Sequence, residues 1–151
     1  MKKNSILIIL LVFFLVSCGY KPILLSEKKK IDIENIKIVK ASRLNSFIKN
    51  NLNSISNKES QKKINLLIDS QKIKSAASKD EKGNPQLLVM SLSVGITVYE
   101  NDEIKSKKQF LESFTYSNNS NKFNLSKYEK SIEKNLRNKI IKNIHIYLVS
   151  F

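Results

Sequence analysis

The most regular segment of the chain reads Leu88-Val89-Met90-Ser91-Leu92-Ser93-Val94-Gly95-Ile96-Thr97-Val98. Its even-numbered positions are all apolar, whereas the odd positions from Ser91 to Thr97 carry serine, glycine or threonine. Successive side chains of a β-strand point to opposite faces, so this alternation predicts a long strand with one buried and one polar face. The rest of the chain is expected to supply the elements that cover the apolar face.

The following segment is predicted to fold back on this strand as a hairpin, turning at Asn101-Asp102-Glu103. A two-residue loop would place Lys105, Lys107 and Gln109 on the buried face. A three-residue loop instead places aromatic residues there, and we therefore expect that register. It sets Phe110 opposite Val94, Phe114 opposite Met90, and Tyr116 opposite Leu88.

The same register leaves Glu112 opposite Leu92 and Lys108 opposite Ile96. A lysine facing the core side is acceptable only if the end of the hairpin lies outside the core, so we expect this end to project. Its three lysines, which we call the basic tip, are Lys105, Lys107 and Lys108.

Four further elements and one loop follow from apolar spacing and helix-capping residues. The predicted elements are a strand at 31–40 whose phase changes between Ile33 and Ile36, a helix at 43–55 capped by Ser42, a strand at 64–68 that could continue to Ile73, a polar loop at 74–86, and a helix at 127–147 opened by a capping box of Ser126 and Glu129. The order β-α-β-β-β-α predicts an α+β fold: a two-layer sandwich with two helices packed on one face of a four-stranded mixed sheet.

The N-terminus indicates export and lipidation. Lys2 and Lys3 precede an eleven-residue apolar run that ends at Val16. As a helix this run would span about 16 Å, too short for the ~30 Å core of a bilayer, which disfavours a transmembrane helix and favours a signal peptide. Leu15-Val16-Ser17-Cys18 resembles the bacterial lipobox, in which the cysteine is acylated. We therefore expect a cleaved signal peptide (1–17), a lipidated arm (18–30) and a single α+β domain (31–151).

The charge balance suggests an anionic partner. The whole chain carries +14, and after removal of the signal peptide 25 basic and 13 acidic residues leave +12. For an exported, membrane-anchored protein, anionic lipid head groups and phosphorylated glycolipids are better candidates than nucleic acid. The excess could equally reflect a composition rich in Lys and Asn. Candidate contacts for such phosphates are the basic tip together with Lys79 and Lys82 of the predicted loop.

Residues suited to catalysis are scarce. The chain has one histidine, His145, expected at the surface near the end of the last helix, and one cysteine, which the lipobox uses. Asp80 and Glu81 form a carboxylate pair, but a solvated turn explains it better than acid–base chemistry. No nucleophile, zinc or phosphate-loop motif is present. We therefore expect a protein that is not an enzyme and that uses no cofactor and no metal.

Cys18-Gly19-Tyr20-Lys21-Pro22, directly after the lipobox, resembles the mature start of alphaproteobacterial LPS-assembly lipoproteins of the LptE type, and the order of elements agrees over the whole chain. The resemblance implies an outer-membrane lipoprotein facing the periplasm, a plug and partner of the LptD β-barrel, and a binder of lipopolysaccharide. Cys18 is the residue that carries over, as the acylated anchor, with palmitate among its expected acyl groups. Two other classes remain open: an accessory subunit of another envelope complex, for barrel assembly or lipid transport, and a lipid-anchored enzyme.

Overall fold

The structure is a computed structural model that describes residues 31–150. The predicted signal peptide, the arm at 18–30 and the anchor residue Cys18 lie outside the described residues. The elements, in chain order, are β1 (Asp32–Ile38), α3 (Arg43–Ile55), β2 (Lys63–Lys79), β3 (Pro85–Glu100), β4 (Glu103–Ser117) and α4 (Lys122–Val149). The predicted α+β class and the order β-α-β-β-β-α are confirmed.

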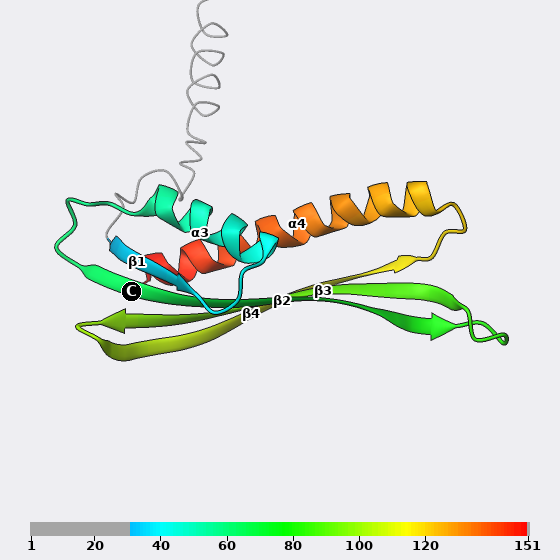
Figure 1. The fold of residues 1–151 in the computed structure, drawn as a ribbon, viewed down its shortest axis with the longest axis horizontal. Coiled ribbons are helices and arrows are strands. Elements are labelled where there is room, and N and C mark those ends of the chain that lie inside the picture. The colour runs from blue at the N-terminus through cyan, green and yellow to red at the C-terminus, as the bar shows by residue number, and fades with distance from the viewer. Residues whose placement is uncertain (1–30, 151) are drawn as a thin grey trace, which may run out of the picture.

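The four strands form one sheet in the order β1-β2-β3-β4, and both helices lie on the same face of it (Figure 1). β1 runs parallel to β2, whereas the β2–β3 and β3–β4 pairs are antiparallel. The sheet is therefore mixed and the architecture is the predicted two-layer sandwich. Neither of the two helices in residues 31–150 lies on the opposite face of the sheet, which we call the back face (Figure 1).

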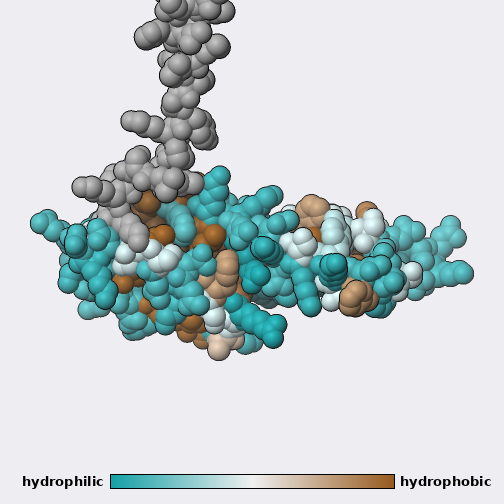
Figure 2. All heavy atoms as spheres, turned by 90° about the horizontal axis from the view of Figure 1, so that it is seen from above, coloured by the Kyte–Doolittle hydropathy of each residue, from teal (hydrophilic) through white to brown (hydrophobic). Residues whose placement is uncertain are grey.

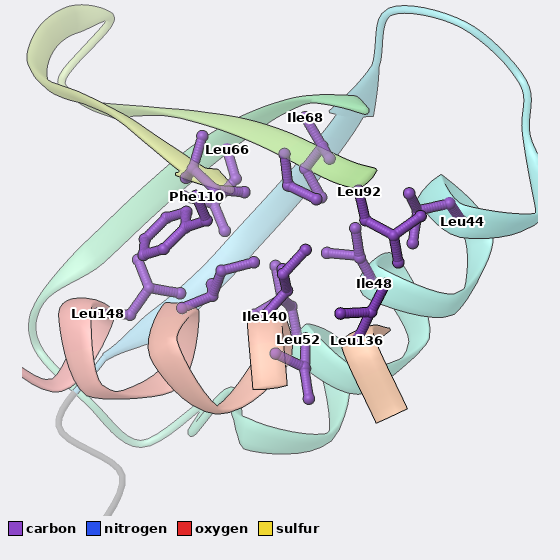
Figure 3. Packing of buried hydrophobic residues seen from close by; sticks show 14 of the residues in the cluster. Leu44, Ile48, Leu52, Leu66, Ile68, Leu92, Phe110, Leu136, Ile140 and Leu148 are labelled. Atoms are coloured by element: carbon purple, nitrogen blue, oxygen red, sulfur yellow. The ribbon is translucent and has the colours of Figure 1, made fainter. Parts of the chain in front are cut away.

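The hydrophobic core lies between the sheet and the two helices. The apolar positions of β3 that were predicted to be buried are all buried, and Leu92, Val94 and Val98 have no exposed surface. Side chains of α3 and α4, including Ile48 and Ile140, face the apolar side of the sheet and complete this core (Figure 3). Because the odd-numbered residues of β3 are only partly buried, the predicted polar back of the strand is confirmed as well.

Helix α3 has the predicted bounds and the predicted cap. The Ser42 hydroxyl accepts a hydrogen bond from Asn45 N at 3.0 Å, which satisfies one of the free N–H groups of the first turn. At the other end, Ser56 Oγ accepts from Ile33 N at 2.8 Å and donates to Asp32 Oδ1 at 3.0 Å. These bonds tie the end of the helix to β1, whose predicted irregularity is present as a register shift between Ile33 and Asn35.

The predicted register of the β3–β4 hairpin is confirmed, but the predicted loop length is wrong. Phe110 pairs with Val94, Phe114 with Met90, and Tyr116 with Leu88. The loop has two residues, Asn101 and Asp102, and a bulge at Lys105 then shifts the register by one residue.

Asn101 and Asp102 have φ values of 52° and 63°. Positive φ at both central residues matches the twist of the flanking strands and is tolerated by Asn and Asp. A two-residue loop followed by a one-residue bulge gives the same register as the predicted three-residue loop, which is why the register is correct although the loop length is not.

Strand β2 is much longer than predicted. The segment at 74–86 was expected to be a loop, yet β2 continues to Lys79 and the connection to β3 is only five residues long. The backbone of Lys74 to Lys79 pairs with β3 as far as Pro85. Both faces of this part of β2 are largely exposed, so no apolar alternation marks it in the sequence.

Helix α4 begins five residues earlier than predicted, and the capping box is absent. Asn121 caps the helix, its Oδ1 accepting a hydrogen bond from Asn124 N at 3.1 Å. Glu129 points instead to the sheet, where it contacts Tyr116 and Lys74. The early start places Leu125 in the core, whereas Tyr128, predicted to lie on the buried stripe, is 49% exposed.

The aromatic residues of β4 were predicted to be buried, and this prediction is wrong for one of them. Phe110 and Tyr116 are 7% and 4% exposed, but Phe114 between them is 43% exposed. α4 therefore covers β4 incompletely at this position, and the gap forms a groove described below.

Candidate functional site

The basic tip lies around the β3–β4 turn, but its three lysines point in different directions. Lys105, on the bulge, forms an ion pair with Glu103 at 3.1 Å. Lys108 lies on the helix face, with its Nζ 4.9 Å from the centre of the Tyr147 ring and 5.6 Å from that of Phe110. Lys107 lies on the back face, because neighbouring side chains of a strand alternate.

Lys79 and Lys82 lie at the other end of the sheet, beside the β2–β3 turn. Asp80 organises this turn: its carboxylate accepts hydrogen bonds from the backbone N–H groups of Lys82 and Asn84 and from the Asn84 side chain. The bonds from Asn84 lower the pKa of Asp80 below its ordinary value. The carboxylate pair noted in the sequence thus has a turn-stabilising member, as expected.

The structure does not bring the five candidate lysines together. β3 joins the two turns and has 16 residues, which corresponds to about 50 Å at the rise of a strand. One phosphorylated head group cannot contact both groups at once. The basic tip lies at the end where the described chain begins, because Asp32 pairs with Lys63 and Asn65 pairs with Tyr99.

A shallow polar trough of about 440 Å³ crosses the back face. Small side chains at Ser93, Gly95 and Thr97 form its floor, and Lys107 and Asp69 lie at its sides. Gln109 Nε2 donates to Ser93 Oγ at 2.8 Å across it. The polar face of β3 is predictable from its sequence, but the trough is not, because it also depends on the side chains that β2 and β4 place beside that face.

An apolar groove of about 360 Å³ lies between β4 and α4, and we call it the β4–α4 groove. Phe114 provides its β4 wall. The α4 wall is formed by Tyr128, Ser131, Ile132, Asn135, Leu136, Asn138 and Lys139. This groove could not be predicted from the sequence, because the spacing that predicts burial of Phe114 and Tyr128 is the same whether or not the helix covers them.

Two polar bridges between strand and helix bound the β4–α4 groove. At one end Asn143 Nδ2 donates to Glu112 Oε1 at 3.2 Å. At the other end the Tyr116 hydroxyl donates to Glu129 Oε1 at 2.8 Å, and the Tyr116 and Tyr128 rings pack edge to face with centroids 6.1 Å apart. Glu112, whose position opposite Leu92 the sequence analysis left unexplained, therefore serves as a strand–helix bridge.

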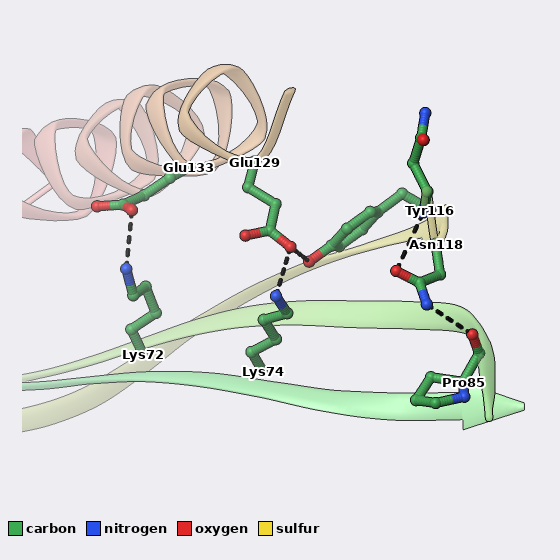
Figure 4. Close-up of polar contacts among 8 residues, drawn as sticks. Lys72, Lys74, Pro85, Tyr116, Asn118, Glu129 and Glu133 are labelled. Atoms are coloured by element: carbon green, nitrogen blue, oxygen red, sulfur yellow. Dashed lines mark hydrogen bonds and ion pairs between the residues drawn. The ribbon is translucent and has the colours of Figure 1, made fainter. Parts of the chain in front are cut away.

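A second row of contacts joins β2 to α4 on the helix-bearing face of the sheet (Figure 4). Lys72 Nζ lies 2.9 Å from Glu133 Oε2, and Lys74 Nζ lies 2.5 Å from Glu129 Oε1. Burial alone would raise the pKa of Glu129, but the hydrogen bonds from Lys74 and Tyr116 and the charge of Lys74 outweigh it, so the pKa lies below its ordinary value. Burial and the bond to Glu129 raise the pKa of Tyr116. We call Tyr116, Glu129 and Lys74 the latch.

The single histidine is half-buried near the end of α4, and burial lowers its pKa. Its Nε2 is buried and has no hydrogen-bond partner among the residues that the structure describes. Within residues 31–150 no group of three or more potential metal-ligating side chains occurs, and no helix there is long and apolar enough to cross a membrane. The helix-bearing face is mainly hydrophilic, with hydrophobic surface in small separate patches (Figure 2).

Several solved structures share this fold. Rare lipoprotein B from Shewanella oneidensis aligns with a TM-score of 0.57 and 13% identity, over 77% of this chain and 94% of that protein. A minor lipoprotein from Acinetobacter baumannii aligns with a TM-score of 0.57 and 10% identity, over 82% and 94% of the two chains. Lipoprotein B from Nitrosomonas europaea aligns with a TM-score of 0.56 and 11% identity, over 79% and 84%.

At these identities the likeness is one of fold. No protein-family model and no curated protein sequence matches the chain.

Proposed function

We propose that the protein is an envelope lipoprotein of the LptE type, anchored to the outer membrane through acylated Cys18 and facing the periplasm. In this role it is the plug and partner of an LptD-like β-barrel and assists the assembly of lipopolysaccharide at the outer membrane. Its work is binding rather than catalysis.

The observation that carries the proposal is the fold shared with lipoproteins from three bacteria over 84–94% of their length. The lipobox ending at Cys18 supports the same proposal from a part of the chain outside the described residues. The barrel partner and the lipopolysaccharide ligand rest on the resemblance of Cys18-Gly19-Tyr20-Lys21-Pro22 to LptE-type lipoproteins. A site for phosphates at the basic tip is the charge-based part of the proposal.

The first test is an affinity pull-down of the tagged, acylated protein from native membranes, with mass spectrometry of the proteins that accompany it. The proposal expects a large outer-membrane β-barrel of the LptD type in stoichiometric amount. A Cys18→Ser variant, which has no thiol to acylate, is the control for anchoring. Recovery of the subunits of a barrel-assembly or lipid-transport machine in its place would contradict the barrel partnership and favour the accessory-subunit alternative.

The lysine part of the proposal is tested by reversing Lys105, Lys107 and Lys108 to Glu together and measuring binding of lipopolysaccharide at low salt. The matched control reverses three exposed lysines of α4, Lys127, Lys130 and Lys134, and so changes the net charge equally. Tip reversal should weaken binding more than the control does, because the tip lysines would contact the phosphates directly, whereas the control lysines act only through the net charge. Equal losses would mean that only net charge matters, and unchanged affinity would remove the tip as a site.

A further inference from the structure

The outer edge of β4 is an unprotected strand edge in the sheet formed by residues 31–150. β4 is the last strand in the order β1-β2-β3-β4, so the N–H and C=O groups on its outer side have no strand partner there. Natural proteins protect such edges with charged residues, prolines or a covering element, because an open edge pairs with other chains. From Gln109 to Ser117 the strand contains one charged residue, Glu112, and that residue bonds to Asn143.

The other free edge of the sheet carries more charge. β1 pairs with β2 only as far as Ile68, and beyond it β2 carries Lys72, Lys74 and Lys79. Lysine on an edge strand disfavours pairing with another chain. Lys72 and Lys74 form ion pairs with Glu133 and Glu129 of α4, so this side of α4 carries ion pairs where the β4 side carries an apolar groove.

The β4–α4 groove lies along the open edge. Phe114, 43% exposed, provides the strand wall, and the bridges of Glu112 and Tyr116 lie two residues to either side of it. Residues two apart on a strand face the same way, so the space between the bridges corresponds to a single side-chain position of a neighbouring strand. Lys139 lies in the α4 wall and takes part in none of the ion pairs described for residues 31–150.

We propose that the β4–α4 groove binds an extended segment of a second protein, which pairs with the edge of β4 as a fifth strand. A large apolar side chain of that segment enters the groove beside Phe114 and Leu136. Acidic residues two positions before or after it face Lys139. Backbone pairing supplies affinity in such strand addition, and the pocket for an alternate side chain supplies specificity.

An acyl chain could fill the groove, but it would leave the N–H and C=O groups at the edge of β4 without partners. The net charge of the chain without its signal peptide, +12, favours an acidic segment over a basic one. The proposal concerns this surface alone and does not depend on which envelope machine the protein serves.

The test uses the full acylated chain in detergent and a fluorescein-labelled peptide, Ser-Thr-Asp-Val-Leu-Val-Asp-Thr-Ser, followed by fluorescence anisotropy. Leu and both Asp residues lie on one face of the extended peptide. In two further peptides every second amide nitrogen is methylated. The first carries its methyl groups along one edge of the extended peptide, and the second carries them along the opposite edge. Strand addition expects saturable binding that is lost when one edge is methylated and kept within about twofold when the other is.

On the protein side, Phe114→Ala should weaken binding about tenfold, since the apolar side chain of the ligand loses the wall it packs against. Phe123→Ala is the matched control, because Phe123 is 78% exposed on α4 and lies outside the groove lining. It should bind within about twofold of the unaltered protein. Lys139→Glu should weaken binding of the acidic peptide. It should strengthen binding of a peptide in which Lys replaces both Asp residues.

Three results would overturn the proposal. The first is failure of the peptide to bind. The second is equal binding of both methylated peptides to the unaltered protein, combined with weaker binding of both to Phe114→Ala. That result would indicate a groove for an apolar ligand such as an acyl chain, without strand pairing. The third is a concentration-dependent dimer that Phe114→Ala abolishes, which would identify a second copy of this chain as the occupant.

Discussion

Replacing Tyr116 with Phe tests whether the latch holds the first half of α4 onto the sheet. The substitution removes one hydroxyl from a residue that is 4% exposed and leaves the ring in place. The hydroxyl donates to Glu129 Oε1 at 2.8 Å, and the carboxylate is charged because its pKa is lowered. The variant therefore removes one charge-assisted hydrogen bond and little else.

A hydrogen bond to a charged group contributes about 1.5–3 kcal/mol to stability. Glu129 keeps Lys74 as a partner in the variant, so we expect a loss near the lower end, about 1.5–2 kcal/mol. For a domain of this size the loss corresponds to a decrease in Tm of about 5–8 °C. The exposed pair of Lys63 and Glu34 is the contrast: Glu34→Gln should leave stability unchanged within error, because solvent screens that pair.

The assay is urea unfolding of the full chain, followed by circular dichroism, for Tyr116→Phe, Glu129→Gln and the double variant. If the hydroxyl acts through Glu129, the two changes should be coupled by about 1 kcal/mol or more. A Tyr116→Phe variant as stable as the unaltered protein would refute the reasoning. Additive effects of the two changes would also refute it, since they would show that the hydroxyl acts elsewhere.

Three further predictions concern particular residues. Asn121→Ala should cost about 1 kcal/mol whereas Ser126→Ala should cost almost nothing in urea unfolding, because Asn121 holds the cap of α4. Asp102→Gly should preserve stability and Asp102→Val should lower it by about 1–2 kcal/mol, since φ at this position is 63°. The stabilisation of the folded state by ionised Glu129 should be complete above its ordinary pKa of 4.5 and should disappear as the pH falls through its lower pKa in the folded state. Measurement of the free energy of unfolding against pH should show this decrease for the unaltered protein and not for Glu129→Gln.

The elements that pack against the core could be predicted from the sequence. The segments that lie outside the core could not. The register of β3 and β4 followed from alternation and from the aromatic residues of β4, and α3 followed from an apolar stripe with a serine cap. The second half of β2 was missed because backbone pairing alone holds it, and pairing leaves no periodic trace when both faces are exposed. The start of α4 was missed because Ser126 and Glu129 match a capping box, while the structure uses Glu129 to reach the sheet.

The candidate site shows a different limit. The two lysine groups were combined because both are basic and both lie at turns, and a sequence without a sheet order cannot tell which turns lie at the same end. The order β1-β2-β3-β4 settles this point, because the antiparallel pairs place the β2–β3 and β3–β4 turns at opposite ends of β3. The β4–α4 groove was invisible for a related reason: the exposure of Phe114 depends on the path of α4.

This separation bears on how an anchored protein would use its charge. If acylated Cys18 anchors the chain in the membrane, residues 18–30 can span at most about 45 Å before the described chain begins at Ile31. The basic tip lies at that end of the sheet, so its lysines are nearer to the anchoring leaflet than Lys79 and Lys82 when the domain points away from the membrane. Lys79 and Lys82 lie about 50 Å further along the strands and meet the same leaflet only if the domain lies along it or turns over on an extended arm. Charge reversal at the two ends should therefore affect membrane binding unequally, and equal effects in a vesicle-binding assay would require a domain that lies along the bilayer.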